Sequence, residues 1–297
     1  MAWLDRHLAT TTQPLLTTPW ILDLDATVKC LYGKQDGAVR DYNPKKPGRP
    51  SHSYHRAWMA NTRLALAVDV LSGHEPAPLH SMPGIWAWLD ALPKEARPAV
   101  LRGDVAYGSE SVLRRPLPGE MLMTEKEDEQ ELLAVLESAV PTKRYEYAVL
   151  VTSTRYEIRA LAPLYRDRAD AENNFDELKN QWGWGGFTTQ DLARCRIMAR
   201  RVAVGYNWWT LFVRLAQPHK HFEASSSRPL LLHGVATQTQ HAGQTRLTIT
   251  SLHAKQSAIQ AVLTSLAGFL STLTANCGAV DRRSAATSHP RPRGRQL

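Results

Sequence analysis

A short stretch of alternating apolar and acidic residues near the start of the chain constrains the fold most strongly. Residues 20–28 read WILDLDATV, in which Leu22 and Leu24 alternate with Asp23 and Asp25. Side chains along a strand repeat every two residues, so the pattern predicts a β-strand with both aspartates on one face. This strand would present two carboxylates side by side.

A third aspartate is predicted at the end of a later strand. The segment PAVLRGDVAYGS, residues 98–109, contains the short apolar stretch Val100 and Leu101 and then runs out into Asp104. The pattern is typical of a short buried strand with the acidic group just beyond its carboxyl end. Periodicity and turn residues also predict paired strands within 58–73, helices over 84–92 and 109–115, a long helix capped by the box Thr188–Asp191, and a last helix near 251–275.

The segment YRDRADAENNFDELK, residues 165–179, predicts an α-helix with four reactive side chains on one stripe. Tyr165, Arg168, Glu172 and Lys179 are spaced by three, four and seven residues. At roughly 100° per residue they fall within an arc of roughly 60°, beside the apolar face. The other acidic residues fall on the opposite side, where we expect them to be solvated: Asp167, Asp170 and Glu177.

The formal net charge of +8 suits a polyanionic partner, and the excess has two main concentrations. Residues 281–297 hold five arginines against one aspartate. Residues 29–56 hold seven basic and two acidic side chains, and their prolines predict a loop with basic groups that project toward phosphates. From charge alone, a solvated linker explains the second segment equally well.

Several classes of protein are disfavoured by composition. The three cysteines, Cys30, Cys195 and Cys277, are far apart and predict neither a disulfide framework nor a thiolate metal site. No run approaches the ~18 apolar residues of a membrane span, so we expect a cytosolic, soluble protein. The histidine pairs His52/His55 and His219/His221 lack further ligands, and Trp208 and Trp209 are expected in the core rather than on DNA bases.

Three carboxylates therefore occupy distinct places: Asp25 on a strand, Asp104 at a strand end and Glu172 on a helix. Two divalent ions roughly 3.5–4 Å apart need oxygen ligands from separate elements, and carboxylates suit Mg²⁺ or Mn²⁺. Because Asp23 shares a face with Asp25, either aspartate is a candidate for the first ligand.

The order of these residues, with Tyr-x2-Arg-x3-Glu-x6-Lys around Glu172, resembles the DDE catalytic domain of bacterial insertion-sequence transposases. Supporting matches are LDLDAT, YGKQDGAVRDYNPKKPGRPSH, VLRGDVAYGS and YEYAVLVTS, and together they cover roughly residues 20–210. In this family the first aspartate precedes a small residue and threonine, which favours Asp25 over Asp23. The resemblance implies an α/β protein with an RNase H-like mixed sheet flanked by helices and a β-rich insertion between Asp104 and Glu172.

The resemblance also implies the roles of the site. Asp25, Asp104 and Glu172 would hold two Mg²⁺ or Mn²⁺ ions for cleavage and strand transfer on double-stranded DNA, at transposon ends and target. A homodimer on DNA in the bacterial cytoplasm, at the nucleoid, would be usual. The residues expected to contact DNA phosphates are Tyr165, Arg168, Lys179, Lys45, Lys46 and Arg49.

The expected organisation has five parts. They are a catalytic core over 1–115 and 164–216, a β-rich insertion over 116–163, a helical region over 217–280 and a basic tail over 281–297. Only 24 residues precede Asp25, so we expect no N-terminal domain for recognising transposon ends. The alternative function is therefore a truncated, catalytically silent DNA-binding remnant. No tryptophan lies within 105–164 to support hairpin chemistry, and cations beside Glu172 disfavour a glycosidase acid.

Overall fold

The computed structural model describes residues 1–17, 19–40, 46–73, 77–104, 107, 156–250, 252–253 and 255–277. The side chains at 77–81, 158, 162, 170–172, 247, 269 and 272–277 lie outside this description. The predicted helix at 109–115, nearly all of the predicted insertion and the basic tail also lie outside the described residues. Lys45 lies outside them as well.

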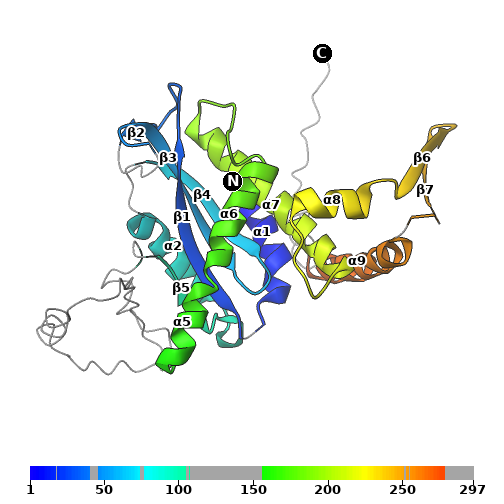
Figure 1. The fold of residues 1–297 in the computed structure, drawn as a ribbon, viewed down its shortest axis with the longest axis horizontal. Coiled ribbons are helices and arrows are strands. Elements are labelled where there is room, and N and C mark those ends of the chain that lie inside the picture. Colours follow the sequence, from blue (N-terminus) through cyan, green and yellow to red (C-terminus); the bar gives the residue numbers. More distant parts are fainter. Residues whose placement is uncertain are drawn as a thin grey trace, which may run out of the picture.

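A mixed β-sheet forms the centre of the molecule (Figure 1). β1 (Ile21–Cys30) pairs antiparallel with β3 (Pro50–Met59), which pairs antiparallel with β4 (Leu64–Ser72) and, near its start, with β2 (Val39–Arg40). β5 (Val100–Arg102) lies parallel to β1 on its other side. The predicted strands of the two aspartate segments are confirmed, and the sheet flanked by helices confirms the RNase H-like fold class.

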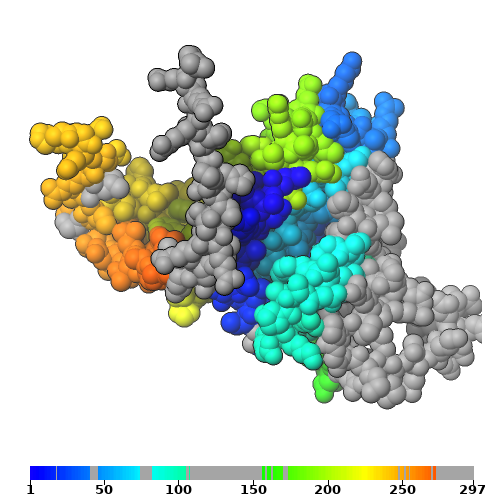
Figure 2. Space-filling model, turned by 180° about the vertical axis from the view of Figure 1, so that it is seen from behind, coloured from blue at the N-terminus to red at the C-terminus, as the bar shows by residue number. Residues whose placement is uncertain are grey.

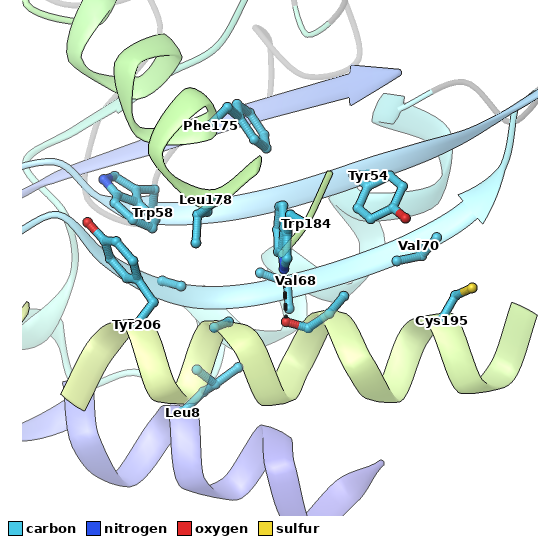
Figure 3. Packing of buried hydrophobic residues seen from close by; sticks show 13 residues of the cluster. Leu8, Tyr54, Trp58, Val68, Val70, Phe175, Leu178, Trp184, Cys195 and Tyr206 are labelled. Atoms are coloured by element: carbon cyan, nitrogen blue, oxygen red, sulfur yellow. Dashed lines mark hydrogen bonds between the residues drawn. The ribbon is translucent and has the colours of Figure 1, made fainter. Parts of the chain in front are cut away.

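Helices cover both faces of the sheet, because apolar side chains alternate along the strands (Figure 1). One face packs against α2 (Ala77–Ala91) through a cluster that includes Leu22, Leu24 and Leu89. The other face packs against α1 (Ala2–Thr12), α6 (Ala169–Gln181) and α7 (Leu192–Ala216). Figure 3 shows this second cluster, in which residues from the sheet, α6, α7 and α1 meet around Trp184. Asp23 and Asp25 alternate with the leucines and so share the second face.

The basic segment 29–56 is less irregular than predicted. β1 continues to Cys30, and β3 begins at Pro50 and carries the chain through Arg56, whose side chain is only 2% exposed. Arg56 therefore does not project toward solvent, because α6 covers its face of the sheet and places Asn174 and Phe175 against the guanidinium. The two paired strands predicted within 58–73 are one strand, β4, which pairs with β3, and most of β3 lies before residue 58.

Helix boundaries also differ from the predictions. The single predicted helix over 165–179 is two helices, α5 (Ile158–Arg166) and α6, separated by a turn at 167–168. The predicted helix over 84–92 begins earlier, at Ala77, and contains Pro83. The long helix α7 is capped by Asp191, whose carboxylate accepts the Arg194 N–H at 2.9 Å, instead of by Thr188.

The C-terminal region packs on the end of α7. α8 (Ala224–Leu232) and α9 (Gln256–Cys277) contribute Leu231 and Ile259 to a small cluster with Val213. The helix predicted near 251–275 is confirmed, whereas the hairpin of β6 (Ala236–His241) and β7 (Gln244–Ile249) was not predicted. This hairpin protrudes from the body of the protein, and α1 and α2 lie on the face seen in Figure 2. No helix in the described segments is long and apolar enough to cross a membrane.

Candidate active site

Asp25 lies on β1 beneath α6 and is only 6% exposed. Its Oδ1 accepts hydrogen bonds from the Ala26 N–H at 3.0 Å and from Arg168 Nη2 at 3.1 Å. Arg56 stands directly opposite Asp25 in the β1–β3 register. Arg56 itself donates to Asn174 Oδ1 at 2.6 Å and lies 3.8 Å from the centroid of the Phe175 ring. Asp25 is therefore a buried carboxylate with two guanidinium groups close by.

The β1–β5 register brings Asp104 to the neighbourhood of Asp25. Asp23 pairs with Arg102 across the parallel strands, and Asp25 and Asp104 each follow two residues later. Burial raises the pKa of Asp25, the charges of Arg168 and Arg56 lower it, and the charge of Asp104 raises it again. The balance leaves this pKa above its ordinary value. Two predicted carboxylates are thus electrostatically coupled.

Asp23, the alternative first ligand, is fully engaged elsewhere. Both of its oxygens accept hydrogen bonds from Arg102, at 2.6 and 2.7 Å, and both side chains are buried. Arg102 also donates to the carbonyl oxygen of Leu164 at the end of α5. This bidentate pair links β1, β5 and α5, and it occupies the carboxylate that would otherwise compete with Asp25.

The predicted stripe on α6 faces β1 at two points. Arg168, at the N-terminal end of α6, binds Asp25, and Lys179 Nζ, in the last turn, donates to Thr27 Oγ1 at 2.6 Å. Glu172 belongs to α6 between them, four residues after Arg168 and seven before Lys179, and its side chain lies outside the described residues. The backbone therefore sets residue 172 on the helical face that Arg168 and Lys179 share.

The other predicted phosphate contacts come from different elements and have no bond to Asp25 in the described structure. Tyr165 belongs to α5, and its side chain is 39% exposed. Lys46 and Arg49 are exposed and lie each 5.0 Å from the centroid of the Tyr32 ring, beyond the end of β1. The structure thus brings together Asp25, Asp104 and Arg168, and it separates Lys46 and Arg49 from them.

A family model described as Transposase DDE domain matches residues 16–208. The chain belongs to this family. The match spans both aspartates and the whole of the Tyr165–Lys179 segment. No curated protein and no solved structure matches significantly.

Glu177 departs from its prediction in this DDE domain. We expected a solvated side chain, but Glu177 is 2% exposed. Its carboxylate accepts the Ala224 N–H at 3.0 Å and lies 3.1 Å from His221 Nε2. The prediction was wrong because α8 and the segment before it cover this side of α6. Glu177 therefore holds the C-terminal region against α6 and has a structural role, unlike the role proposed for Asp25 on β1.

The weaker metal candidates of the DDE domain gain no support. Within the described residues, no three His, Cys, Asp or Glu side chains are grouped closely enough to hold a metal ion. His52 bonds the Asp36 carbonyl oxygen, and His221 lies on Glu177. Cys30 and Cys195 form no disulfide within the described residues.

Two basic residues of the site were missed at the level of sequence. Arg56 was assigned to a loop, and Arg102 was not singled out at all. Both positions could have been found from the strand pattern, since Arg102 stands two residues before Asp104 and an antiparallel partner of β1 must place some residue opposite Asp25. The register, however, depends on pairing across the sheet.

Proposed function

We propose that this DDE transposase domain catalyses metal-dependent DNA strand cleavage and strand transfer at the ends of an insertion sequence. The observation that carries the proposal is the coupling of Asp25 with Asp104 beneath a helix that carries Arg168, Glu172 and Lys179 in series. A purely structural ion pair would not need the second carboxylate, whose charge makes ionisation of Asp25 less favourable.

The donor set fits divalent metal ions. Asp25 and Asp104 supply carboxylate oxygens from separate strands, and both hydrogen bonds to Asp25 within the described part of the chain end on Oδ1. A cation shared by the two carboxylates would offset their repulsion, and oxygen ligands suit Mg²⁺ or Mn²⁺. Asp25, Asp104 and Glu172 would hold two such ions. When bound, the pair supplies activation of the attacking oxygen and charge stabilisation at the leaving 3′-oxygen.

The basic residues would orient the carboxylates and the DNA. Arg168 holds Oδ1 of Asp25, and its own Nε is buried with no partner in the described structure, which leaves a donor for a phosphate oxygen. Lys179 would supply a positive charge at the opposite end of α6 from Arg168. Tyr165, on α5, would contact a DNA phosphate. Lys45, Lys46 and Arg49 would bind phosphates farther along the DNA.

The substrate implied by this chemistry is double-stranded DNA, at both transposon ends and target. Two ends must be cut and joined together, so we propose that two copies of the chain assemble on DNA. DNA cleavage and strand transfer would take place at the nucleoid of a bacterial cell.

Nicking of supercoiled plasmid in Mg²⁺ and in Mn²⁺ tests the proposal. We expect nicked product with the wild-type chain and loss of it in Asp104→Asn and in Glu172→Gln. Asp176→Asn is the matched control, because this α6 carboxylate is exposed and bonds only Asn180 in the described structure. Unchanged nicking in both site variants would refute the assignment. Salt-sensitive DNA binding without nicking in either metal would instead identify a silent DNA-binding remnant.

A further inference from the structure

The β6–β7 hairpin is a two-stranded ribbon that stands clear of the rest of the protein (Figure 1, Figure 2). Its strands pair with each other along their whole length, and neither pairs with another strand in the described part of the chain. Every side chain of β6 is exposed, and so are those of Gln244, Thr245, Arg246 and Thr248 on β7. A hairpin without a third strand is marginally stable at best in water. Such a projection is therefore better suited to contact a partner than to stabilise the fold.

Local geometry fixes the shape and the position of this ribbon. Ala242 and Gly243, the two turn residues, both have positive φ, at 48° and 75°, which is the type I′ geometry that matches the twist of the strands. At the base, the Thr250 N–H donates to the Val235 carbonyl oxygen at 2.9 Å. Val235 packs on the cluster at the end of α7, and α8 before it is hydrogen-bonded to Glu177 of α6. The ribbon is thus connected to α6 by packed elements.

The register sorts the side chains of the ribbon onto two faces. Partners across an antiparallel pair share a face, and the faces alternate along each strand. One face, which we call the polar face, carries only side chains that can form hydrogen bonds. They lie in three cross-strand pairs: Thr237 with Thr248, Thr239 with Arg246, and His241 with Gln244. The opposite face includes apolar positions, because Ala236 pairs there with Ile249.

The charge of this region suits a polyanion. Residues 224–280 contain no aspartate or glutamate, whereas Arg228, Arg246 and Lys255 are basic. A carboxylate would repel a phosphate backbone, so a region without carboxylates can approach DNA closely. Protein interfaces are centred on a buried apolar core, and the polar face has no apolar side chain. The ribbon is therefore better matched to nucleic acid than to another copy of the chain.

The dimensions of the ribbon match the major groove of DNA. B-form DNA has a major groove about 12 Å wide and about 8.5 Å deep, which admits a two-stranded ribbon. The paired strands lie about 4.8 Å apart, so side chains fill the remaining width, and six residues extend about 20 Å. In this groove glutamine reads adenine and arginine reads guanine by paired hydrogen bonds, and threonine contacts several bases. Gln244 and Arg246 therefore have the side chains that direct reading of bases requires.

We propose that the β6–β7 hairpin lies in the major groove of duplex DNA and reads its sequence through the polar face. The inference rests on the proposed function for the presence of DNA. Gln244 and Arg246, closest to the turn, contact base edges, and Thr237 and Thr248, near the base of the ribbon, contact the flanking phosphates. Recognition of the DNA is thereby separate from the carboxylates that act on it.

Selection from a pool of short duplexes with randomised centres tests the proposal, in chelator so that no cleavage occurs. The comparison variant replaces residues 236–249 with two glycines. Because Val235 and Thr250 follow the last pair of the register, two glycines reproduce the link between His241 and Gln244. We expect the wild type to enrich a common sequence and the shortened variant, checked by thermal melting, to enrich none. No enrichment by the wild type, or the same sequence from both proteins, would overturn the proposal.

Two glutamines on opposite faces supply a matched pair of point variants that leave the ribbon intact. Gln244 is on the polar face, and Gln240, also exposed and also close to the turn, is on the opposite face. On the enriched duplex, Gln244→Ala should bind about tenfold more weakly, the loss expected for one bidentate base contact. Gln240→Ala should bind like the wild type. Equal affinities of the two variants would refute the assignment of the polar face.

Chemical protection tests the choice of groove. Within the enriched sequence, the wild type should protect guanine N7, which faces the major groove, from dimethyl sulfate. Protection confined to adenine N3, in the minor groove, would refute the proposal.

Light scattering without DNA tests a second copy of the chain as the occupant. A wild-type dimer that becomes a monomer when the ribbon is removed would make the hairpin an interface between copies and would overturn the proposal. Plasmid nicking by the wild type is measured separately. Nicking without enrichment would refute the role of the ribbon alone, and enrichment without nicking would refute the proposed function alone.

Discussion

Asp23 and Asp25 lie two residues apart on one face of β1, and the fold treats them in opposite ways. Asp23 uses both oxygens on Arg102, within a pair that joins two strands and a helix. Within the described residues, Asp25 accepts two hydrogen bonds, both on one oxygen. Burial and then the charge of Asp104 raise its pKa. The Asp23–Arg102 pair, in which both carboxylate oxygens are bonded, stabilises the fold. A buried carboxylate with a like-charged neighbour, as at Asp25, is instead typical of a ligand-binding site.

The largest expected difference is in stability. Asp23→Ala leaves the Arg102 guanidinium buried without its partner, which typically costs about 3–5 kcal/mol of the free energy of unfolding. Asp25→Ala should cost less, because the loss of its bond to buried Arg168 is offset by removal of a desolvated carboxylate and of its repulsion with Asp104. Urea denaturation of both variants measures the contrast. Equal losses would show that the two aspartates are structurally equivalent.

Nicking activity should reverse the order of the two positions. Asp25→Asn removes a proposed metal ligand while keeping the shape, and we expect a loss above the about 100-fold that changes next to a metal ligand produce. Asp23→Asn should retain most activity at a temperature where it is folded. Plasmid nicking in Mn²⁺ provides the measurement. Activity in Asp25→Asn together with none in Asp23→Asn would assign the first ligand to Asp23.

A substitution of Arg168, whose guanidinium donates to Asp25, tests whether the arginine beside Asp25 is needed for activity. Arg168→Lys keeps the charge but cannot keep the planar donor set, so nicking should fall about tenfold. The exposed α7 residue Arg201 supplies the control Arg201→Lys, which should be neutral. Full activity in Arg168→Lys would mean that Arg168 acts only as a point charge.

The smallest expected effect is the pH dependence of stability. The pKa of Asp25 is raised in the folded protein above its ordinary 3.8, so folding favours the protonated form. Below pH 3.8 wild type and Asp25→Asn should be similar in this respect, and the wild type should lose stability relative to the variant as pH rises through the folded-state pKa. Paired thermal melts across this range, in chelator, measure it. A relative gain by the wild type would contradict the direction of the shift.

The sequence was sufficient for features that repeat locally. The period of two around Asp25 predicted β1, and the apolar stretch before Asp104 predicted β5. Burial that depends on distant partners was not predictable. Glu177 is buried because His221 and Ala224 come from residues 44 and 47 positions later. Arg56 is buried because α6 places Asn174 and Phe175, more than a hundred residues later in the chain, over its face of the sheet.

The site shows the same division. Residue types and spacing identified Arg168 and Lys179 as companions on a helix, but the turn at 167–168, which places Tyr165 on another helix, has no strong local signal such as proline or glycine. That Arg102 uses both oxygens of Asp23, and so leaves Asp25 as the better candidate ligand, depends on the β1–β5 register, which the sequence does not give.

Gly185 sets how closely the loop before α7 approaches the end of α6, where its N–H donates to the Lys179 carbonyl oxygen at 3.1 Å. A β-carbon at this position would lie 2.8 Å from the Lys179 carbonyl oxygen, closer than atoms pack, so the backbone tolerates no side chain there. Even a methyl group would push the loop and the last turn of α6 apart and would disturb the position of Lys179, whose Nζ donates to Thr27 on β1. The absence of a side chain at residue 185 thus lets Lys179 reach the strand that carries Asp25.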